Sequence, residues 1–144
     1  MKIMDRRKFL QKSIYATCGL ATASILIESC GKSNNSSPSV AAAPTVNFTL
    51  DISTSPYNAL QTNGNFVYSN NVIIARDNSG NFVALYDICP HAGCTVQFNG
   101  TNMFPCPCHG SVFNESGAVV SGPAPSGLKK YNTQLTGNQL HVWG

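Results

Sequence analysis

The sequence has few charged side chains, because Asp, Glu, Lys and Arg together make up 10% of its 144 residues. The formal net charge of +3 arises entirely in the first 29 residues, where five basic side chains accompany two acidic ones. From residue 30 onward the charges cancel, with Lys32, Arg76, Lys129 and Lys130 balancing Asp51, Asp77, Asp87 and Glu115. Nucleic-acid binding requires clustered Lys and Arg, so the sequence argues against a nucleic-acid partner.

The chain also lacks length and a long apolar run. At 144 residues and 15.3 kDa it allows one small domain, which excludes an enzyme with a separate substrate domain. Its longest uncharged apolar run, residues 13–27, would be roughly 22 Å long as a helix, too short for a bilayer core of about 30 Å. Arg6 and Arg7 precede this run. Residues 1–29 are therefore interpreted as an export signal peptide that resembles Tat-pathway signals, rather than as an amphipathic helix packed on the domain.

The next segment predicts a membrane tether. Residues 27–31, Ile-Glu-Ser-Cys-Gly, resemble a lipobox, in which Cys30 is lipidated. Residues 30–45 contain Ser, Asn, Pro and Ala without an apolar pattern, which is typical of a flexible linker with a reach of roughly 20 Å. We expect an exported protein anchored on the periplasmic side of a bacterial cell envelope. Cleavage without lipid and an uncleaved signal helix stay open as alternatives.

The remaining residues, 46–144, show no helical period and no internal repeat. Residues 46–52 alternate strictly between apolar and polar side chains, which is typical of a half-buried strand. Further strands are predicted at residues 66–68, 72–76, 82–88, 95–98, 111–113, 129–135 and 139–143, separated by Asn-, Gly- and Ser-rich turns. This pattern predicts an all-β fold, a small antiparallel sandwich or open barrel.

Four of the six cysteines fall in two short boxes, Cys-Pro-His-Ala-Gly-Cys at residues 89–94 and Cys-Pro-Cys-His-Gly-Ser at residues 106–111. Two of the three histidines of the chain, His91 and His109, lie in the same boxes. Each box follows a predicted strand or apolar segment and is rich in Pro and Gly. Two such loops can enclose a buried metal centre from both sides.

These two boxes are similar to the signature of the Rieske iron-sulfur family, in which two histidines replace two cysteines on one iron of a [2Fe-2S] cluster. The resemblance, over about residues 66–144, implies an antiparallel β-sandwich with a small cluster-binding subdomain formed by two loops. It implies that Cys89 and Cys106 bind one iron and that His91 and His109 bind the other. It also implies a Cys94–Cys108 disulfide, which export makes plausible. Gly122-Pro123-Ala124-Pro125 resembles the family's proline loop over the cluster.

Two positions bear on the reduction potential. A site with two thiolates and two neutral imidazoles carries less negative charge than four thiolates, so its potential is higher, about −150 to +300 mV against about −400 mV. Ser111 matches the family serine that donates a hydrogen bond to sulfur, which raises the potential. Phe113 stands where high-potential members have tyrosine and lacks its hydroxyl. We expect a potential below that of the tyrosine-bearing members.

Other interpretations of the boxes fit less well. Structural zinc sites favour wider spacings than Cys-x-His, and two purely structural disulfides leave the paired histidines unexplained. His141 lies outside the boxes and is expected to be an ordinary histidine rather than a ligand. Phe113 and Trp143 are expected to be packing residues.

Nothing in the sequence resembles a substrate pocket, so the expected function is one-electron transfer within an oxidoreductase rather than stand-alone catalysis. The first hypothesis is the iron-sulfur subunit of a cytochrome bc-type quinol-oxidising complex, with membrane quinol, cytochrome b and a cytochrome c-type haem protein as partners. Ala92 argues against the quinol-oxidising hypothesis, because quinol-oxidising members commonly have leucine at this position. The alternatives are an arsenite oxidase-like electron-transfer subunit or a free-standing periplasmic carrier, and less well a cytoplasmic dioxygenase ferredoxin.

Overall fold

The structure, a computed structural model, describes residues 42–144 as a small protein of two antiparallel β-sheets. The elements in chain order are β1 Asn47–Asp51, the 3-10 helix η1 Tyr57–Gln61, β2 Phe66–Ser69, β3 Val72–Arg76, β4 Phe82–Tyr86, β5 Met103–Pro105, β6 Val112–Asn114, β7 Val119–Ser121, β8 Lys130–Thr136 and β9 Gln139–Trp143. Six strands form one sheet in the order β1-β9-β8-β4-β3-β2, and three form a second in the order β5-β6-β7. The all-β prediction is confirmed.

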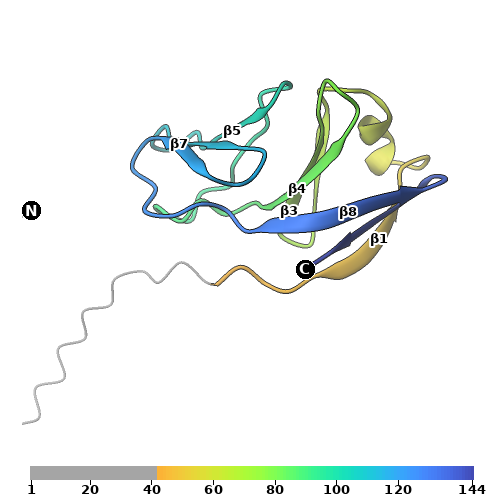
Figure 1. The fold of residues 1–144 in the computed structure, drawn as a ribbon, viewed down its shortest axis with the longest axis horizontal. Helices are drawn as coiled ribbons and strands as arrows, with labels where there is room; N and C mark the ends of the chain where they lie inside the picture. Colours follow the sequence, from red (N-terminus) through yellow and green to blue (C-terminus); the bar gives the residue numbers. More distant parts are fainter. Residues whose placement is uncertain (1–41) are drawn as a thin grey trace, which may run out of the picture. The chain divides into compact units, whose positions relative to one another are not determined.

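The second sheet is an insertion between β4 and β8, and Figure 1 shows it beside one end of the larger sheet. The β3 and β4 strands connect the two parts, because both of their faces are buried. Val72 and Ile74 of β3 point into one hydrophobic core, formed with β1, η1, β8 and β9. Ile73 and Ala75 point into a second core, which contains the inserted segment. Strands buried on both faces explain why this part of the sequence is a continuous apolar run.

Local sequence signals account for most of the large sheet. The apolar side chains of residues 46–52 all pack into the first core, as the alternating pattern predicts. Asn70 and Asn71 take positive φ angles of 52° and 60° and so form the tight turn between β2 and β3, where a right-handed strand twist favours that conformation. The β8–β9 hairpin around Gly137 is also confirmed.

The inserted region departs from the predicted elements. The strand predicted at residues 95–98 is wrong, because that segment makes only one isolated bridge, between Ile88 and Thr95. Its backbone instead makes single hydrogen bonds, from the Val96 N–H to the Asp87 carbonyl and from the Gln97 N–H to the carbonyl of Pro105 at the end of β5. Strands β5 and β7 and the helix η1 were not predicted, and β4 ends two residues earlier than expected.

The predicted signal peptide at residues 1–29, Cys30 and most of the predicted linker lie outside the described residues. At the described end of the linker, the Pro44 carbonyl accepts hydrogen bonds from Lys129 Nζ and the Tyr131 hydroxyl at 3.1 and 2.8 Å. Within residues 42–144, no helix has the length and hydrophobicity needed to cross a membrane.

Candidate metal centre

The two cysteine-histidine boxes adopt the same backbone conformation. In each box the first residue's N–H donates to the sixth residue's carbonyl, from Cys89 to Cys94 at 2.8 Å and from Cys106 to Ser111 at 2.7 Å. The fifth residue, a glycine with φ near +75° in both boxes, donates back to the carbonyl of the first cysteine. Such left-handed backbone favours glycine. The structure therefore builds the site from two equivalent loops, although their sequences differ at the third, fourth and sixth positions.

The first cysteine of each loop is a buried free thiol. Cys89 and Cys106 are 1% and 2% exposed, and both belong to the second hydrophobic core. Burial raises the pKa of the Cys89 thiol, and the neighbouring Cys106 thiol raises it further. Hydrogen bonding from the His91 backbone and the Ser111 side chain lowers the pKa and so opposes this rise. The loops thus place both free thiols in one buried core, where the pKa of the Cys89 thiol is raised overall.

The two histidines lie on the exposed side of the same loops. The rings of His91 and His109 face each other edge to face, with centroids 4.7 Å apart, and both residues are exposed. Buried thiols therefore lie on the inner side of the loops and accessible imidazoles on the outer side. His141, by contrast, lies on β9, where its Nε2 is 2.8 Å from Asn47 Oδ1 and its ring stacks on Trp143.

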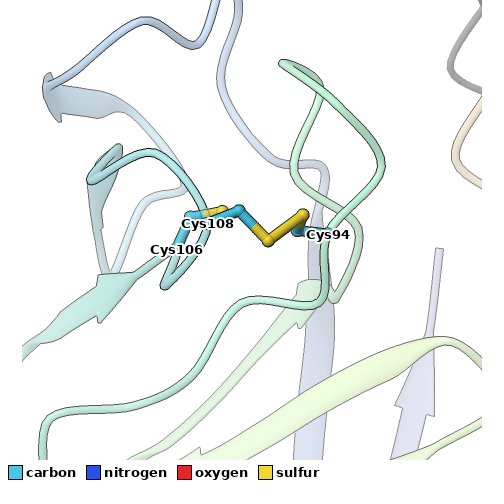
Figure 2. A group of neighbouring side chains, drawn as sticks. All are labelled: Cys94, Cys106 and Cys108. Carbon is cyan, nitrogen blue, oxygen red and sulfur yellow. A yellow bond between two sulfur atoms is a disulfide. The ribbon is translucent and has the colours of Figure 1, made fainter.

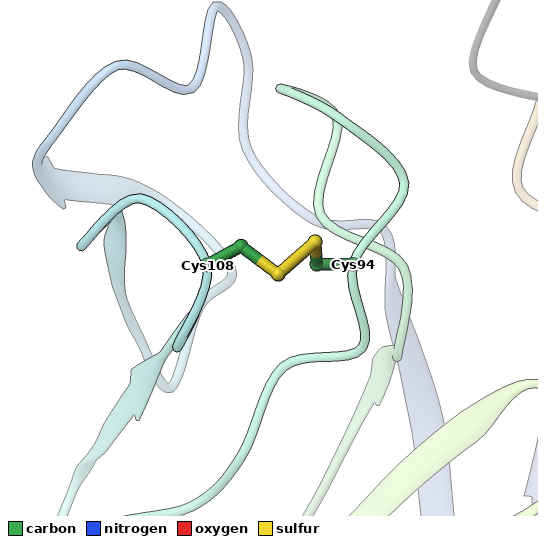
Figure 3. The surroundings of a disulfide bond; sticks show 2 residues. All are labelled: Cys94 and Cys108. Atoms are coloured by element: carbon green, nitrogen blue, oxygen red, sulfur yellow. A yellow bond between two sulfur atoms is a disulfide. The ribbon is translucent and has the colours of Figure 1, made fainter.

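A disulfide between Cys94 and Cys108 joins the two loops, with Cα atoms 6.4 Å apart. Figure 3 shows that each cysteine comes from a different loop. The predicted disulfide is confirmed. It connects the sixth position of the first loop to the third position of the second, so the positions that differ between the boxes are the ones used for the cross-link.

A third segment, the predicted proline loop, covers the second box. The Ala124 N–H donates to the fully buried Ser111 Oγ at 3.1 Å, and hydrogen bonding from the Ser111 side chain lowers the pKa of the Cys89 thiol. Gly122, at φ +95°, lies so close that an added Cβ would be 2.4 Å from the Ser111 Cα atom. Only glycine allows this approach, which places the proline loop directly against Ser111 of the second box.

A third sulfur lies beside the disulfide. The Sγ atoms of Cys94, Cys106 and Cys108 all lie within 4.8 Å of one another. Figure 2 shows these three side chains together. These three sulfurs are not a ligand set for a metal, because two of them are bonded to each other and only Cys106 keeps a thiol. The residues with free donor atoms at the site are Cys89, Cys106, His91 and His109.

Sequence reasoning missed Asp87, which lies two residues before Cys89. Its side chain is 8% exposed, its Oδ1 has no hydrogen-bond partner among the described residues, and burial raises its pKa. A carboxylate at the end of the apolar run of β4, directly before the first box, is the signal that could have identified Asp87 as a buried acidic group beside the site. Phe113, expected to be a packing residue, is fully buried in the second core.

These donors fit a mixed-ligand iron-sulfur cluster. A [2Fe-2S] cluster with two histidine ligands needs two thiolates for one iron and two imidazoles for the other. The structure supplies two buried thiols in one core, two facing imidazoles and a buried hydroxyl at Ser111. Four donors of one kind, as in most ferredoxins, are not present in the described loops.

Comparison with known proteins agrees with this geometry. A profile of the Rieske [2Fe-2S] domain matches residues 50–132. The cytochrome b6-f complex iron-sulfur subunit 1 of Synechocystis sp. (strain ATCC 27184 / PCC 6803 / Kazusa) is 38% identical over 72 residues, which cover 49% of this chain and 40% of that protein. The cytochrome b6-f complex iron-sulfur subunit of Chlorobaculum tepidum is 31% identical over 78 residues, covering 54% of this chain and 43% of that protein.

The chain thus aligns with less than half the length of these relatives. Among solved structures, the cyanobacterial plasma membrane Rieske protein PetC3 from Synechocystis PCC 6803 is 35% identical, with a TM-score of 0.47, over 55% of this chain and 84% of that one.

Proposed function

Since this chain belongs to the Rieske [2Fe-2S] domain family, we propose that Cys89 and Cys106 bind one iron of its cluster and that His91 and His109 bind the other. The support is the separation of donor types in the loops, with the thiols buried and the imidazoles exposed. Bound there, the cluster accepts and donates one electron at a time.

The residues around the site have distinct tasks in this proposal. The Ser111 hydroxyl and the His91 N–H stabilise negative charge on the Cys89 sulfur, which makes an added electron less costly. The disulfide and the proline loop hold the two loops together and exclude water from the thiol side. The exposed rings of His91 and His109 meet the redox partner.

We infer that the whole protein is the iron-sulfur subunit of a cytochrome bc-type complex, taking electrons from a membrane quinol and passing them to a cytochrome c-type haem. The observation that carries this proposal is the exposed His91–His109 pair on a disulfide-linked pair of loops. The relatives named as cytochrome b6-f subunits support it.

One observation favours a second candidate, an electron-transfer subunit of another exported oxidoreductase or a free-standing carrier. Ala92 is exposed next to His91, so the tip of the first loop presents only a methyl group where a larger apolar side chain would seat against a quinol site. Copurification of the tagged full chain from native membranes separates the two. A cytochrome b partner supports quinol oxidation, whereas a molybdenum enzyme or no partner supports the second candidate.

The cluster itself is tested by an EPR spectrum of the dithionite-reduced protein. The proposal expects a rhombic signal with an average g near 1.9, the value the family resemblance implies. An iron-replete, folded sample without that signal would contradict it.

We also propose that residues 1–29 are a Tat-type signal, that Cys30 carries a lipid, and that residues 30–45 tether the domain to the periplasmic side of the membrane. The sequence pattern alone supports this. Cys30→Ser should abolish labelling by a fatty-acid precursor and release the protein from washed membranes, and retained labelling would contradict the assignment.

A further inference from the structure

The position of Cys106 beside the Cys94–Cys108 disulfide has a chemical consequence that cluster binding does not use. Cys106 is a free thiol, and its Sγ lies within 4.8 Å of both disulfide sulfurs. A thiolate near a disulfide can attack one of its sulfurs and exchange partners, without any oxidant or reductant. The three sulfurs in Figure 2 are thus an exchange site whose attacking group is also a cluster ligand.

We propose that, when the cluster is absent, Cys106 exchanges into the disulfide and forms a Cys94–Cys106 bond. The Cys106 thiol gives its proton to water, and its sulfur attacks the Cys94 sulfur. The Cys94–Cys108 bond breaks as the new bond forms, and its electron pair goes to the Cys108 sulfur, which takes up a proton. One disulfide and one thiol are present before and after the step, so the oxidation state of the protein does not change.

The direction of attack follows from the chain. Attack on Cys108 would join two residues separated only by Pro107, whose ring fixes φ, so the product would be a small strained ring. Attack on Cys94 joins two residues on different loops, as the present disulfide does. The leaving cysteine is then Cys108, which is exposed and so is readily solvated as a thiolate. The stable product is therefore Cys94–Cys106 with a free, exposed Cys108.

This exchange would prevent the stripped protein from binding a new cluster. It converts a ligand thiol into half of a disulfide, so the exchanged protein offers one buried thiol, Cys89, instead of two. Bound iron, in turn, would hold the Cys106 sulfur and prevent the attack. It follows, if Cys106 is a ligand as proposed above, that the cluster has to be inserted before the disulfide forms or before exchange occurs.

The test compares the full-length protein before and after its cluster is removed with an iron chelator under native conditions. Samples are quenched in acid at intervals, alkylated with N-ethylmaleimide at controlled pH and digested without reduction. Because Cys106 and Cys108 are separated only by Pro107 and so share a peptide, fragmentation in the mass spectrometer assigns which of them carries the bond to Cys94. Loaded protein should give only the Cys94–Cys108 peptide pair. After chelation, a Cys94–Cys106 pair with alkylated Cys108 should replace it over minutes to hours. A stripped protein that keeps Cys94–Cys108, with both Cys89 and Cys106 alkylated, would overturn the inference.

Two variants give a matched comparison, because each lacks one of the two thiols. Cys89→Ser retains Cys106 and should show the exchanged pair without chelator, whereas Cys106→Ser should keep Cys94–Cys108 throughout. Exchange in the Cys106 variant would show that Cys106 is not the attacking residue.

The two proposals fail in different ways. Exchange in the loaded protein would show that bound iron does not protect Cys106 and so contradict the ligand assignment. Absence of exchange after chelation would contradict only the inference made here. The fraction of stripped protein that can be reconstituted with a cluster should also fall as the exchanged pair accumulates, and it should return after full thiol reduction. This readout is independent of electron transfer.

Discussion

At the scale of single residues, the three histidines lie in two different environments. His91 and His109 face each other on the exposed side of the loops, while His141 is hydrogen bonded to Asn47 and stacked on Trp143. We expect His109→Ala to abolish the EPR signal of the reduced cluster, because one iron loses a ligand. His141→Ala is the matched control and should keep the signal. A native spectrum from the His109 variant would refute the ligand assignment.

Hydrogen bonds to sulfur set a second prediction at this scale. Hydrogen bonding from the Ser111 side chain lowers the pKa of the Cys89 thiol, and Phe113, which has no hydroxyl, is buried in the same core as Cys89. One hydrogen bond is worth about 1 kcal/mol, which for one electron corresponds to roughly 40 mV. Ser111→Ala should therefore lower the midpoint potential by about that amount, and Phe113→Tyr should raise it. A redox titration followed by EPR measures both, and shifts of the same sign would contradict the argument.

At the scale of elements, the turn between β3 and β4 depends on an ionised side chain. Asp77 accepts hydrogen bonds from the Asn81 backbone and side chain at 2.8 and 3.0 Å. Burial opposes its ionisation, but these bonds, with those from the Ser79 and Gly80 backbones, outweigh burial and lower its pKa. A carboxyl whose folded-state pKa is lowered stabilises the fold above its unfolded pKa, and this contribution is lost as pH falls through the folded value.

Asp77→Asn should accordingly destabilise the protein by about 1 kcal/mol at pH 7, after allowance for solvent screening. The difference from wild type should shrink as the pH falls below the usual carboxyl range. Urea unfolding from pH 7 to pH 3 measures it. An equal loss at both ends of the range would mean that the substitution acts through shape rather than charge.

The disulfide joins the two loops, so that they behave as one element. Its cysteines are 14 residues apart in the sequence, and closing a loop of that length stabilises a fold by about 3 kcal/mol. Replacing both Cys94 and Cys108 by serine should reduce the free energy of unfolding by about that amount and speed cluster loss to a chelator. The double variant also removes the exchange site, so it isolates the cross-link. Unchanged cluster release would indicate that the proline loop alone holds the loops together.

The elements that the sequence predicts well are those whose signals are local. Residues 46–52 alternate because one face of β1 is buried, and Asn70-Asn71 specifies its turn through backbone conformation. Residues 95–98 carry the same alternation, with Val96 and Phe98 buried, yet they make only one isolated bridge and single backbone hydrogen bonds instead of a continuous strand ladder. Alternation reports burial of one face and not pairing, which is why this strand was predicted wrongly and the three-residue strand β5 was missed.

At the scale of the whole molecule, the fold has two hydrophobic cores, and the candidate metal centre belongs to the second of them. The six-stranded sheet supplies one core, and the insertion between β4 and β8 supplies a second that contains both free thiols. The candidate donors could be predicted from the sequence because two short boxes hold them all. The burial of Asp87 and the nearness of Cys106 to the disulfide could not, because they depend on how β4, the two boxes and the proline loop pack together.

The balanced charge of the domain predicts how it meets a partner. Beyond residue 30 four basic and four acidic side chains cancel, so no net charge steers its approach. Association between proteins without electrostatic steering depends little on salt, whereas steered association falls steeply as ionic strength rises.

Reoxidation of the reduced protein by a soluble c-type cytochrome should therefore change by less than about threefold between 10 and 200 mM salt, since screening has little steering to remove. Stopped-flow absorbance at the haem band measures the bimolecular rate. A tenfold decline over that range would reveal a local charged patch around the exposed histidines that the balance of charges conceals. A weak salt dependence would instead place recognition in the shape and hydrogen bonding of the His91–His109 tip.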